Sequence, residues 1–97
     1  MAELSASQNP IVFTAQGDVL LFPIQIQAFY FEGTGSANDI IELVHRLSGQ
    51  IVWRTRMTGT TRVERLTFAD NGLSAPEGLL LQIFDPTGTL SVYQRIN

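Results

Sequence analysis

Apolar and polar residues alternate along most of this chain with the two-residue period of β-strands. The clearest case is residues 24–31, where Ile24, Ile26 and Ala28 share one face and glutamines occupy the other. From Ala28 onward both faces become apolar, which predicts a strand covered on both sides. Pro23 cannot donate to a sheet ladder, so we expect it at a strand start or a bulge.

Shorter runs of the same kind, separated by glycine- and proline-rich turns, predict further strands. They cover residues 11–14, 19–22, 50–57, 62–68, 78–84 and 89–96. About seven or eight short strands at this spacing predict an all-β fold, a single antiparallel β-sandwich or jelly-roll-like domain. We expect this domain to span residues 10–97. Residues 1–9 are small and polar without periodicity, so we expect an N-terminal arm or tail.

Residues 38–47 fit two periodicities. An apolar stripe from Ile40 to Leu47 fits a helix that Gly49 would end. The same residues also fit a strand covered on both sides, joined through Ser48-Gly49 to the run 50–57 as a β-hairpin. Because the surroundings are all β, we expect a strand.

The end of the chain places two apolar, β-prone runs around Asp85-Pro86-Thr87-Gly88. The Asp85 side chain can form a hydrogen bond to the turn backbone, Pro86 sets φ at about −65°, and Gly88 can adopt a left-handed conformation. This pattern predicts a β-hairpin that closes the chain, with Leu90 and Val92 on one face of its second strand.

The composition is poor in charge. Charged residues make up 15% of the chain, against about 25% in an ordinary soluble domain, and 44% of the residues are hydrophobic. All six basic residues are arginine. Lysine commonly protects exposed sheet edges, whereas arginine is favoured at interfaces. The bias has two interpretations: codon usage in a GC-rich genome, or a surface covered by neighbouring subunits.

The residue types that carry catalysis and metal binding are sparse. There is no cysteine, His45 is the single histidine, and the carboxylates are scattered singly, so we expect no metal, no cofactor and no enzyme. The net charge of −3 argues against nucleic-acid binding. No apolar run approaches the ~20 residues that span a bilayer, and no secretory signal begins the chain, so we expect no membrane contact and synthesis in the cytoplasm.

Arginines are the candidate partner-contact residues. Residues 46–65 hold five of the six arginines but one acid, Glu64, so neighbouring strands here would form one basic face suited to heterologous packing. The alternative is a solvated strand face with a cross-strand pair to Glu64. A further arginine near the chain end would meet a neighbour if it lies at a sheet edge. The candidates are Arg54, Arg56, Arg62, Arg65 and Arg95.

Aromatic residues in strands are usually core, and we expect this of Phe29, Phe31 and Trp53. The alternative for Trp53, or for Tyr93, is a platform on which a sugar stacks.

Several segments follow one another in an order that carries a resemblance. They are 23–31, 39–43 with the turn 48–49, Leu66-Thr67-Phe68, the run from Gly72-Leu73 to Gly78-Leu79, and Leu90-Ser91-Val92-Tyr93. This order resembles the small β-sandwich virion proteins of tailed bacteriophages over residues 19–96. The pattern is one of aliphatics and turns, and the arginine density of residues 54–65 departs from it.

The resemblance implies a structural role in a particle made in the host cytoplasm. Such proteins resemble capsid decoration (cement) proteins, which bind in many copies on the capsid exterior at joints between major capsid protein subunits. The expected partners are the major capsid protein or other virion proteins, and the expected state is a homo-oligomer, with a trimer favoured. The alternatives are a small carbohydrate-binding module of a tail or fibre, and a head–tail component.

Overall fold

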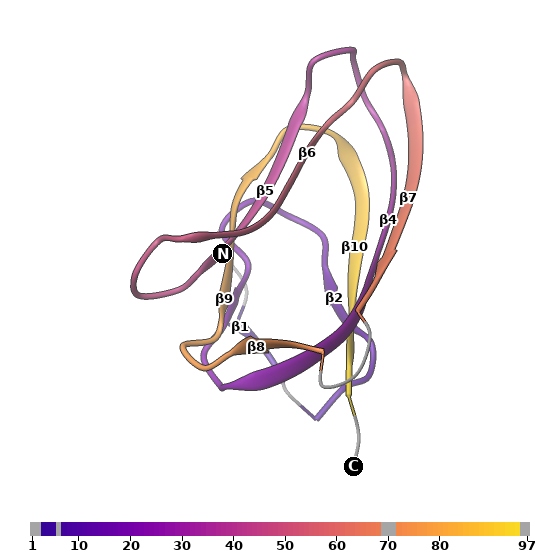
Figure 1. Ribbon diagram of the computed structural model, residues 1–97. Coiled ribbons are helices and arrows are strands. Elements are labelled where there is room, and N and C mark those ends of the chain that lie inside the picture. Colours follow the sequence, from indigo (N-terminus) through magenta and orange to yellow (C-terminus); the bar gives the residue numbers. More distant parts are fainter. Residues whose placement is uncertain (1–2, 6, 69–71, 96–97) are drawn as a thin grey trace.

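The computed structural model describes residues 3–5, 7–68 and 72–95, which form ten strands in two packed sheets (Figure 1). The first sheet has the order β1 (Glu3–Leu4), β3 (Val19–Leu20), β9 (Leu79–Phe84), β5 (Ile40–His45) and β6 (Ile51–Arg56). The second has the order β2 (Ile11–Phe13), β10 (Thr87–Gln94), β4 (Ile24–Thr34) and β7 (Thr61–Thr67), with β8 (Leu73–Ala75) on the start of β4. The predicted all-β sandwich is confirmed.

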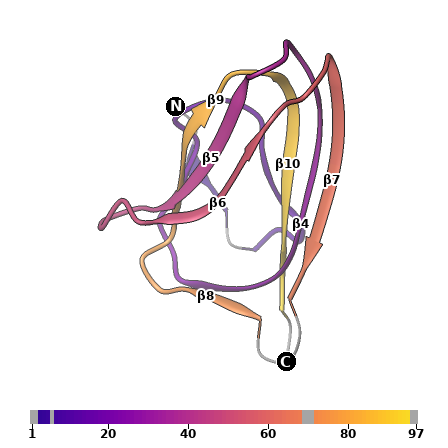
Figure 2. The ribbon, with the colours of Figure 1, turned by 45° about the horizontal axis from the view of Figure 1, so that its top comes forward.

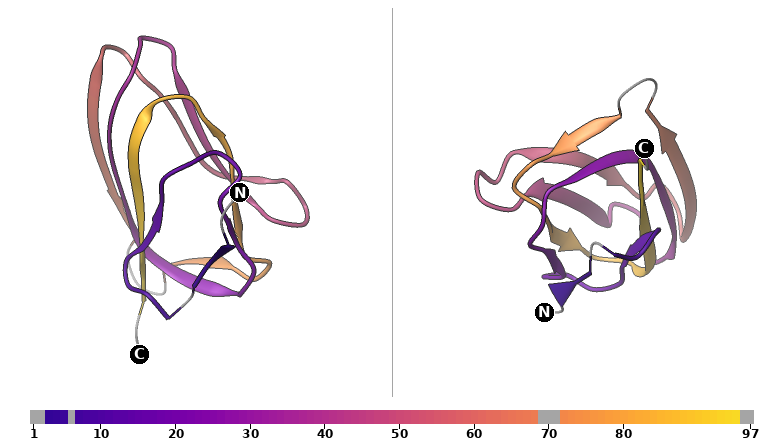
Figure 3. Two further views of the ribbon diagram at one scale, coloured as in Figure 1. Left: turned by 180° about the vertical axis from the view of Figure 1, so that it is seen from behind. Right: turned by 90° about the horizontal axis from the view of Figure 1, so that it is seen from below.

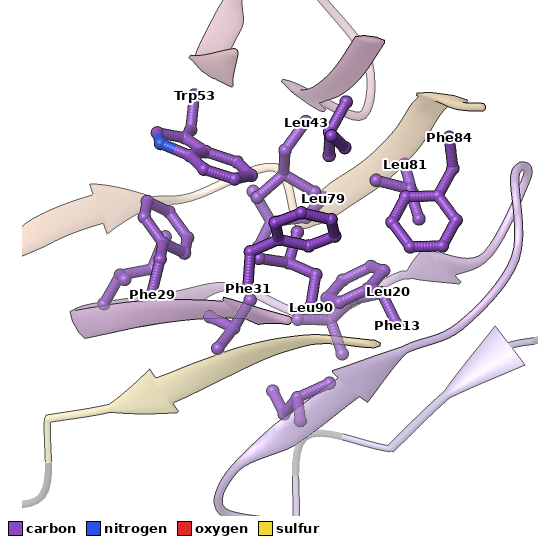
Figure 4. Packing of buried hydrophobic residues seen from close by; sticks show 14 of the residues in the cluster. Phe13, Leu20, Phe29, Phe31, Leu43, Trp53, Leu79, Leu81, Phe84 and Leu90 are labelled. Atoms are coloured by element: carbon purple, nitrogen blue, oxygen red, sulfur yellow. The ribbon is translucent and has the colours of Figure 1, made fainter. Parts of the chain in front are cut away.

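Inward-facing residues of both sheets meet in one hydrophobic core (Figure 4). Trp53 of β6 stacks on Phe29 of β4 with ring centroids 5.7 Å apart, and it lies 6.3 Å from Phe31. Phe84 of β9 meets the ring of Phe31 edge-on at 6.0 Å. These aromatic pairs hold the two sheets together, each adding about 0.5–1.5 kcal/mol beyond area burial. The expected core role of Trp53 is confirmed.

The apolar residues of β4 change face because of a bulge. Pairing with β10 matches Ile26 to Gln94 and Ala28 to Tyr93, which leaves Gln27 with no counterpart. The buried positions therefore shift from even-numbered to odd-numbered residues along the strand, ending at Phe31. On the outer face after the bulge, Ala28 is buried, Tyr30 is half-buried and Glu32 is exposed, so the prediction that both faces are covered holds only for the start of this stretch. The position of β4 after Pro23 is as expected.

Residues 38–47 contain a strand, as expected, and not a helix. β5 pairs antiparallel with β6 through a turn at residues 46–50, and it pairs on its other side with β9. A residue with no counterpart, Val52, interrupts the pairing with β6, and Gln82 interrupts the pairing with β9. The alternation predicted for β6 fails at the first of these bulges, because Ile51 is 55% exposed while Trp53 is buried.

The predicted closing hairpin was wrong. β9 lies in the first sheet and β10 in the second, so the chain crosses between the sheets at Asp85. Asp85 does not cap its own turn: its carboxylate accepts the N–H of Ile40 at 2.9 Å, and its own N–H donates to the Ile40 carbonyl at 3.1 Å. Gly88 belongs to β10 and pairs with Gly33 of β4. Two apolar runs around a turn are therefore compatible with a crossing between sheets as well as with a hairpin.

The two long sides of the sandwich differ. On one, which we call the closed side, the short strands β1 and β2 lie next to each other. On the other, the open side, β6 ends the first sheet and β7 ends the second, and residues 57–60 join them (Figure 2). Seen from below, β7 is the outermost strand of its sheet (Figure 3, right).

Candidate interaction surface

The described residues contain no group of three or more histidine, cysteine, aspartate or glutamate side chains placed to hold a metal ion. His45 ends β5, and its Nδ1 is buried without a hydrogen-bond partner in the described part of the chain. In a catalytic triad this nitrogen contacts an orienting carboxylate, and none of the described carboxylates contacts it.

A depression of about 350 Å³ lies over the ends of β4, β7 and β10. The cross-strand pair Gly33 and Gly88 forms part of its lining. Glu32 and Arg62 are its charged lining residues, and threonines supply most of the other polar groups. This set includes no activated nucleophile and no paired carboxylates, so it offers polar contacts without an evident reaction.

The structure brings four of the five candidate arginines to the open side. Arg54 and Arg56 lie on β6, and Arg62 and Arg65 lie on β7. Arg54, Arg56 and Arg65 are exposed. The sequence could show the clustering of these residues but not that both strands are sheet edges.

Arg54 lies opposite Glu42 in the pairing of β5 with β6. Directly opposed residues share a face, so both belong to the outer face of the first sheet. Glu42 is only 7% exposed, whereas Arg54 is exposed. Arg56, two residues on, shares this outer face and is opposite Ile40. The outer face of the first sheet therefore carries two exposed guanidinium groups at its edge.

Arg62 and Glu64 form an ion pair on the other edge strand. The Arg62 Nε lies 3.4 Å from a Glu64 carboxylate oxygen, and both side chains are 29% exposed. Both residues oppose core-facing positions of β4, Gly33 and Phe31, so they lie on the inner face of β7. A pair this exposed stabilises the fold by no more than about 1 kcal/mol. The side-chain contact of Glu64 is thus with its own strand neighbour.

β7 also exposes apolar side chains that the sequence did not single out. Val63 is 63% exposed and Leu66 is 41% exposed. Their signal in the sequence is faint: charged residues fall on both faces of the run 62–68, which is typical of a strand at a sheet edge. Together with the arginines, they make this edge both charged and apolar.

Arg95 lies apart from the other candidates. It follows β10, an interior strand of the second sheet, and its N–H donates to the Gln25 carbonyl at 2.8 Å. β10 is flanked by β2 and β4, so Arg95 does not belong to an edge strand.

One end of the sandwich gathers exposed apolar residues. Leu21 and Phe22 follow β3, and Leu47 lies in the turn after β5. Gly78 lies between the end of β3 and the turn after β5. It lies close to the Leu20 carbonyl, and its own carbonyl accepts the N–H of Arg46. The exposed fractions of Leu21, Phe22 and Leu47 are 39%, 53% and 70%. This end is a second surface that a partner could cover.

The turn after β5 is held by a carboxylate from the turn that leads into β9. Glu77 accepts the N–H of Ser48 at 2.8 Å and that of Leu47 at 3.0 Å. The bond from Ser48 is the main reason that the pKa of Glu77 lies below its usual value of 4.5. Arg46 Nε donates to the Glu77 carbonyl at 3.0 Å. These bonds fix the position from which β6 starts.

Of the two aromatic residues considered for sugar stacking, Trp53 is 8% exposed and lies in the core. Tyr93 on β10 is 38% exposed. A stacking platform in the described chain would therefore use Tyr93 rather than Trp53.

Comparison of the chain with known protein families, with curated proteins and with solved structures finds no match. Within the described residues, no helix is long and apolar enough to cross a bilayer.

Proposed function

We propose that this chain is a structural virion protein, a capsid decoration or cement protein that binds outside the capsid at joints between major capsid protein subunits. The observation that carries the proposal is the open side. Two long edge strands there present arginines, exposed apolar residues and no lysine, in a chain with few charged residues overall. Sheet edges are usually protected from other proteins. Edge strands that expose arginine and apolar side chains are therefore typical of a protein that binds other subunits in an assembly.

The outer face of the first sheet is the surface we assign to the capsid. Arg54 and Arg56 are exposed there, and neither side chain has a hydrogen bond or an ion pair to another described residue. Arginine forms forked contacts with carboxylates, and it loses less free energy of hydration at an interface than lysine does. We therefore expect an acidic strip on the capsid subunits at the joint.

Such a protein acts by adding contact area across a joint. A standard interface buries roughly 1,600 Å², and the net gain per copy is modest because ordering and desolvation oppose it. With copies at every joint, the internal pressure of packaged DNA must break these added contacts wherever the head begins to open.

The test is binding to capsids that lack the protein, assembled from the major capsid protein of the same virus. Purified chain should co-sediment with them at a fixed number of copies, and loaded particles should resist heating better than empty ones. The double variant Arg54→Glu, Arg56→Glu should bind at least about tenfold more weakly. The matched control Arg54→Lys, Arg56→Lys keeps the charge but not the forked contacts, so its binding should lie between that of the wild-type chain and that of the charge-reversed variant.

If the wild-type chain does not co-sediment, the proposed function is wrong. If it binds and the double variant binds equally well, the function stands and the assigned surface is wrong. Glycan binding that is lost in Tyr93→Ala, with the fold intact by circular dichroism, would instead favour a recognition module of a tail or fibre.

A further inference from the structure

The backbone of β7 offers unpaired hydrogen-bonding groups along its outer edge. Phe68 donates to the Gln27 carbonyl and Gly35 donates to the Thr60 carbonyl, and both pairs continue the register of β4 with β7. Antiparallel ladders alternate, so the even-numbered residues of β7 bond to β4. The N–H and C=O groups of Thr61, Val63 and Arg65 therefore point away from the sheet.

The other sheet edges are less suited to accept a strand. β1 has two residues and β2 has three, and the bulge at Val52 interrupts β6. Short strands and bulges are the usual means of protecting an edge. β7 has seven residues in continuous register with β4 and contains neither proline nor lysine. It is the long, regular edge of the described structure.

The charges on the inner face of β7 restrict what can pair there. An arbitrary strand added beside β7 would partly bury Arg62 and Glu64 without supplying opposite charges. A second copy of β7 supplies both charges itself. We propose that two copies of this chain associate by antiparallel pairing of β7 with β7, with the two-fold axis at Val63.

This register places Arg62 opposite Glu64 of the second copy, and Glu64 opposite its Arg62. Val63 meets its own equivalent, and Thr61 meets Arg65 of the second copy, so the outward groups of the odd-numbered residues pair with one another. The two intrachain ion pairs then combine into a square of alternating charges. The exposed Val63 side chains are buried against each other.

The competing registers are worse for electrostatic reasons. An axis at Arg62 or Arg65 brings two arginines face to face, and an axis at Glu64 opposes two glutamates. An axis nearer either end of β7 pairs only a few residues. Because the two-fold contact uses the same edge of both copies, the pairing is closed and does not propagate into a fibre.

This inference goes beyond the proposed function and does not rest on it. It assigns β7 to a second copy, while Arg54 and Arg56 on the other sheet are left for the capsid. The pairing is two-fold, in contrast to the trimer that the resemblance implies.

Sedimentation equilibrium tests the association. The wild-type chain should dimerise reversibly below roughly 1 mM, the range in which even a weak interface associates. Arg62→Glu and Glu64→Arg should each weaken dimerisation by roughly a hundredfold, since each creates like-charge contacts. An equimolar mixture of these two variants should form a heterodimer, and the double variant Arg62→Glu, Glu64→Arg should dimerise again. Arg54→Glu, the matched charge reversal on β6, should leave dimerisation unchanged.

Cross-linking tests the register, because the chain has no native cysteine. Val63→Cys should form a disulfide-linked dimer on oxidation, since a hydrogen-bonded antiparallel pair has Cα atoms about 5.5 Å apart. Arg65→Cys alone should not cross-link, because its equivalents lie about 14 Å apart along the strand. A mixture of Thr61→Cys with Arg65→Cys should cross-link.

Circular dichroism and thermal unfolding establish that each variant is folded. A wild-type chain that stays monomeric throughout this range overturns the inference. It is also overturned if the mixture of charge variants fails to associate, or if Arg65→Cys cross-links as well as Val63→Cys.

Discussion

On the closed side of the sandwich, β1 and β2 have three residues or fewer, whereas β6 and β7 on the open side have six and seven. On the closed side, side-chain oxygens accept backbone N–H groups and hold the turns next to the short strands. The Asp18 carboxylate is 2% exposed and accepts the N–H of Thr14 and that of Ala15, which holds the turn between β2 and β3. Asn9 accepts the Gln94 N–H at 2.9 Å and so ties the entry to β2 against β10.

On the open side, the connection through residues 57–60 is held by backbone hydrogen bonds, among them those of Met57 with Asn38 and Asp39. The two edge strands retain exposed apolar and charged side chains. The difference teaches that a sandwich of this size need not complete both of its sides. Buried residues on both sides contribute to the free energy of folding, and the exposed side chains of the open side remain available for association. Changes to buried or hydrogen-bonded residues should therefore destabilise the monomer, and changes to the exposed residues of the open side should affect mainly assembly.

The largest contrast should come from truncating one apolar residue on each side. Phe13→Ala on β2 removes a fully buried ring and should lower the free energy of unfolding by about 3–5 kcal/mol. Leu66→Ala on β7, where the side chain is 41% exposed, should cost no more than about 1 kcal/mol. Urea unfolding at a protein concentration low enough to dissociate any dimer measures both. Equal losses would show that Leu66 is part of the same core.

Asp18→Ala should give the next largest loss. It leaves two backbone N–H groups without their acceptor in a partly buried turn, which should cost about 1–3 kcal/mol. The matched control is Asp39→Ala, whose carboxylate accepts one exposed N–H, that of Ser36 at 2.9 Å, and should cost at most about 1 kcal/mol. In urea unfolding, we expect Asp18→Ala to have a lower midpoint than Asp39→Ala, with the same dependence of the free energy of unfolding on urea concentration in both variants. A control that costs as much as Asp18→Ala would contradict the special role of the closed side.

Most of the fold could be predicted from local pattern. Alternation located the long strands, and the all-β context decided correctly for a strand at residues 40–45. Pairing between distant segments could not be predicted in this way. The turn at Asp85 fits a hairpin by its residues, yet a contact with Ile40, 45 positions away in sequence, turns the chain into the other sheet. Bulges at Gln27 and Val52 likewise arise from neighbouring strands.

The candidate surface was predictable in its residues but not in its geometry. The run of arginines identified residues 54–65, and no local signal states that β6 and β7 end their sheets. Edge position depends on strand order, which depends on the whole core. Arg95 shows the limit of the same reasoning: it was a candidate on the condition that its strand lies at a sheet edge, but β10 is flanked on both sides.

The ion pair on the open side should matter little to the isolated chain. A double-mutant cycle of Arg62→Ala and Glu64→Ala, measured on the monomer, should give a coupling free energy below about 1 kcal/mol, since both groups are 29% exposed. The same substitutions should weaken dimerisation clearly. A large coupling in the monomer would mean that the pair belongs to the fold rather than to an interface.

The smallest effect should be local, at the turn from which β6 starts. The pKa of Glu77 is lowered chiefly by the N–H of Ser48, so the ionised form is favoured in the folded chain. Its contribution to stability is complete above the unfolded pKa and is lost as the pH falls through the lowered folded pKa. The amide resonances of Leu47 and Ser48 should therefore shift below the usual value of 4.5 in the wild-type chain and not in Glu77→Gln. The control Glu32→Gln, an exposed carboxylate on β4, should leave this titration unchanged. If Glu77→Gln also alters dimerisation, the turn is coupled to the open side, and the two edge strands act together rather than separately.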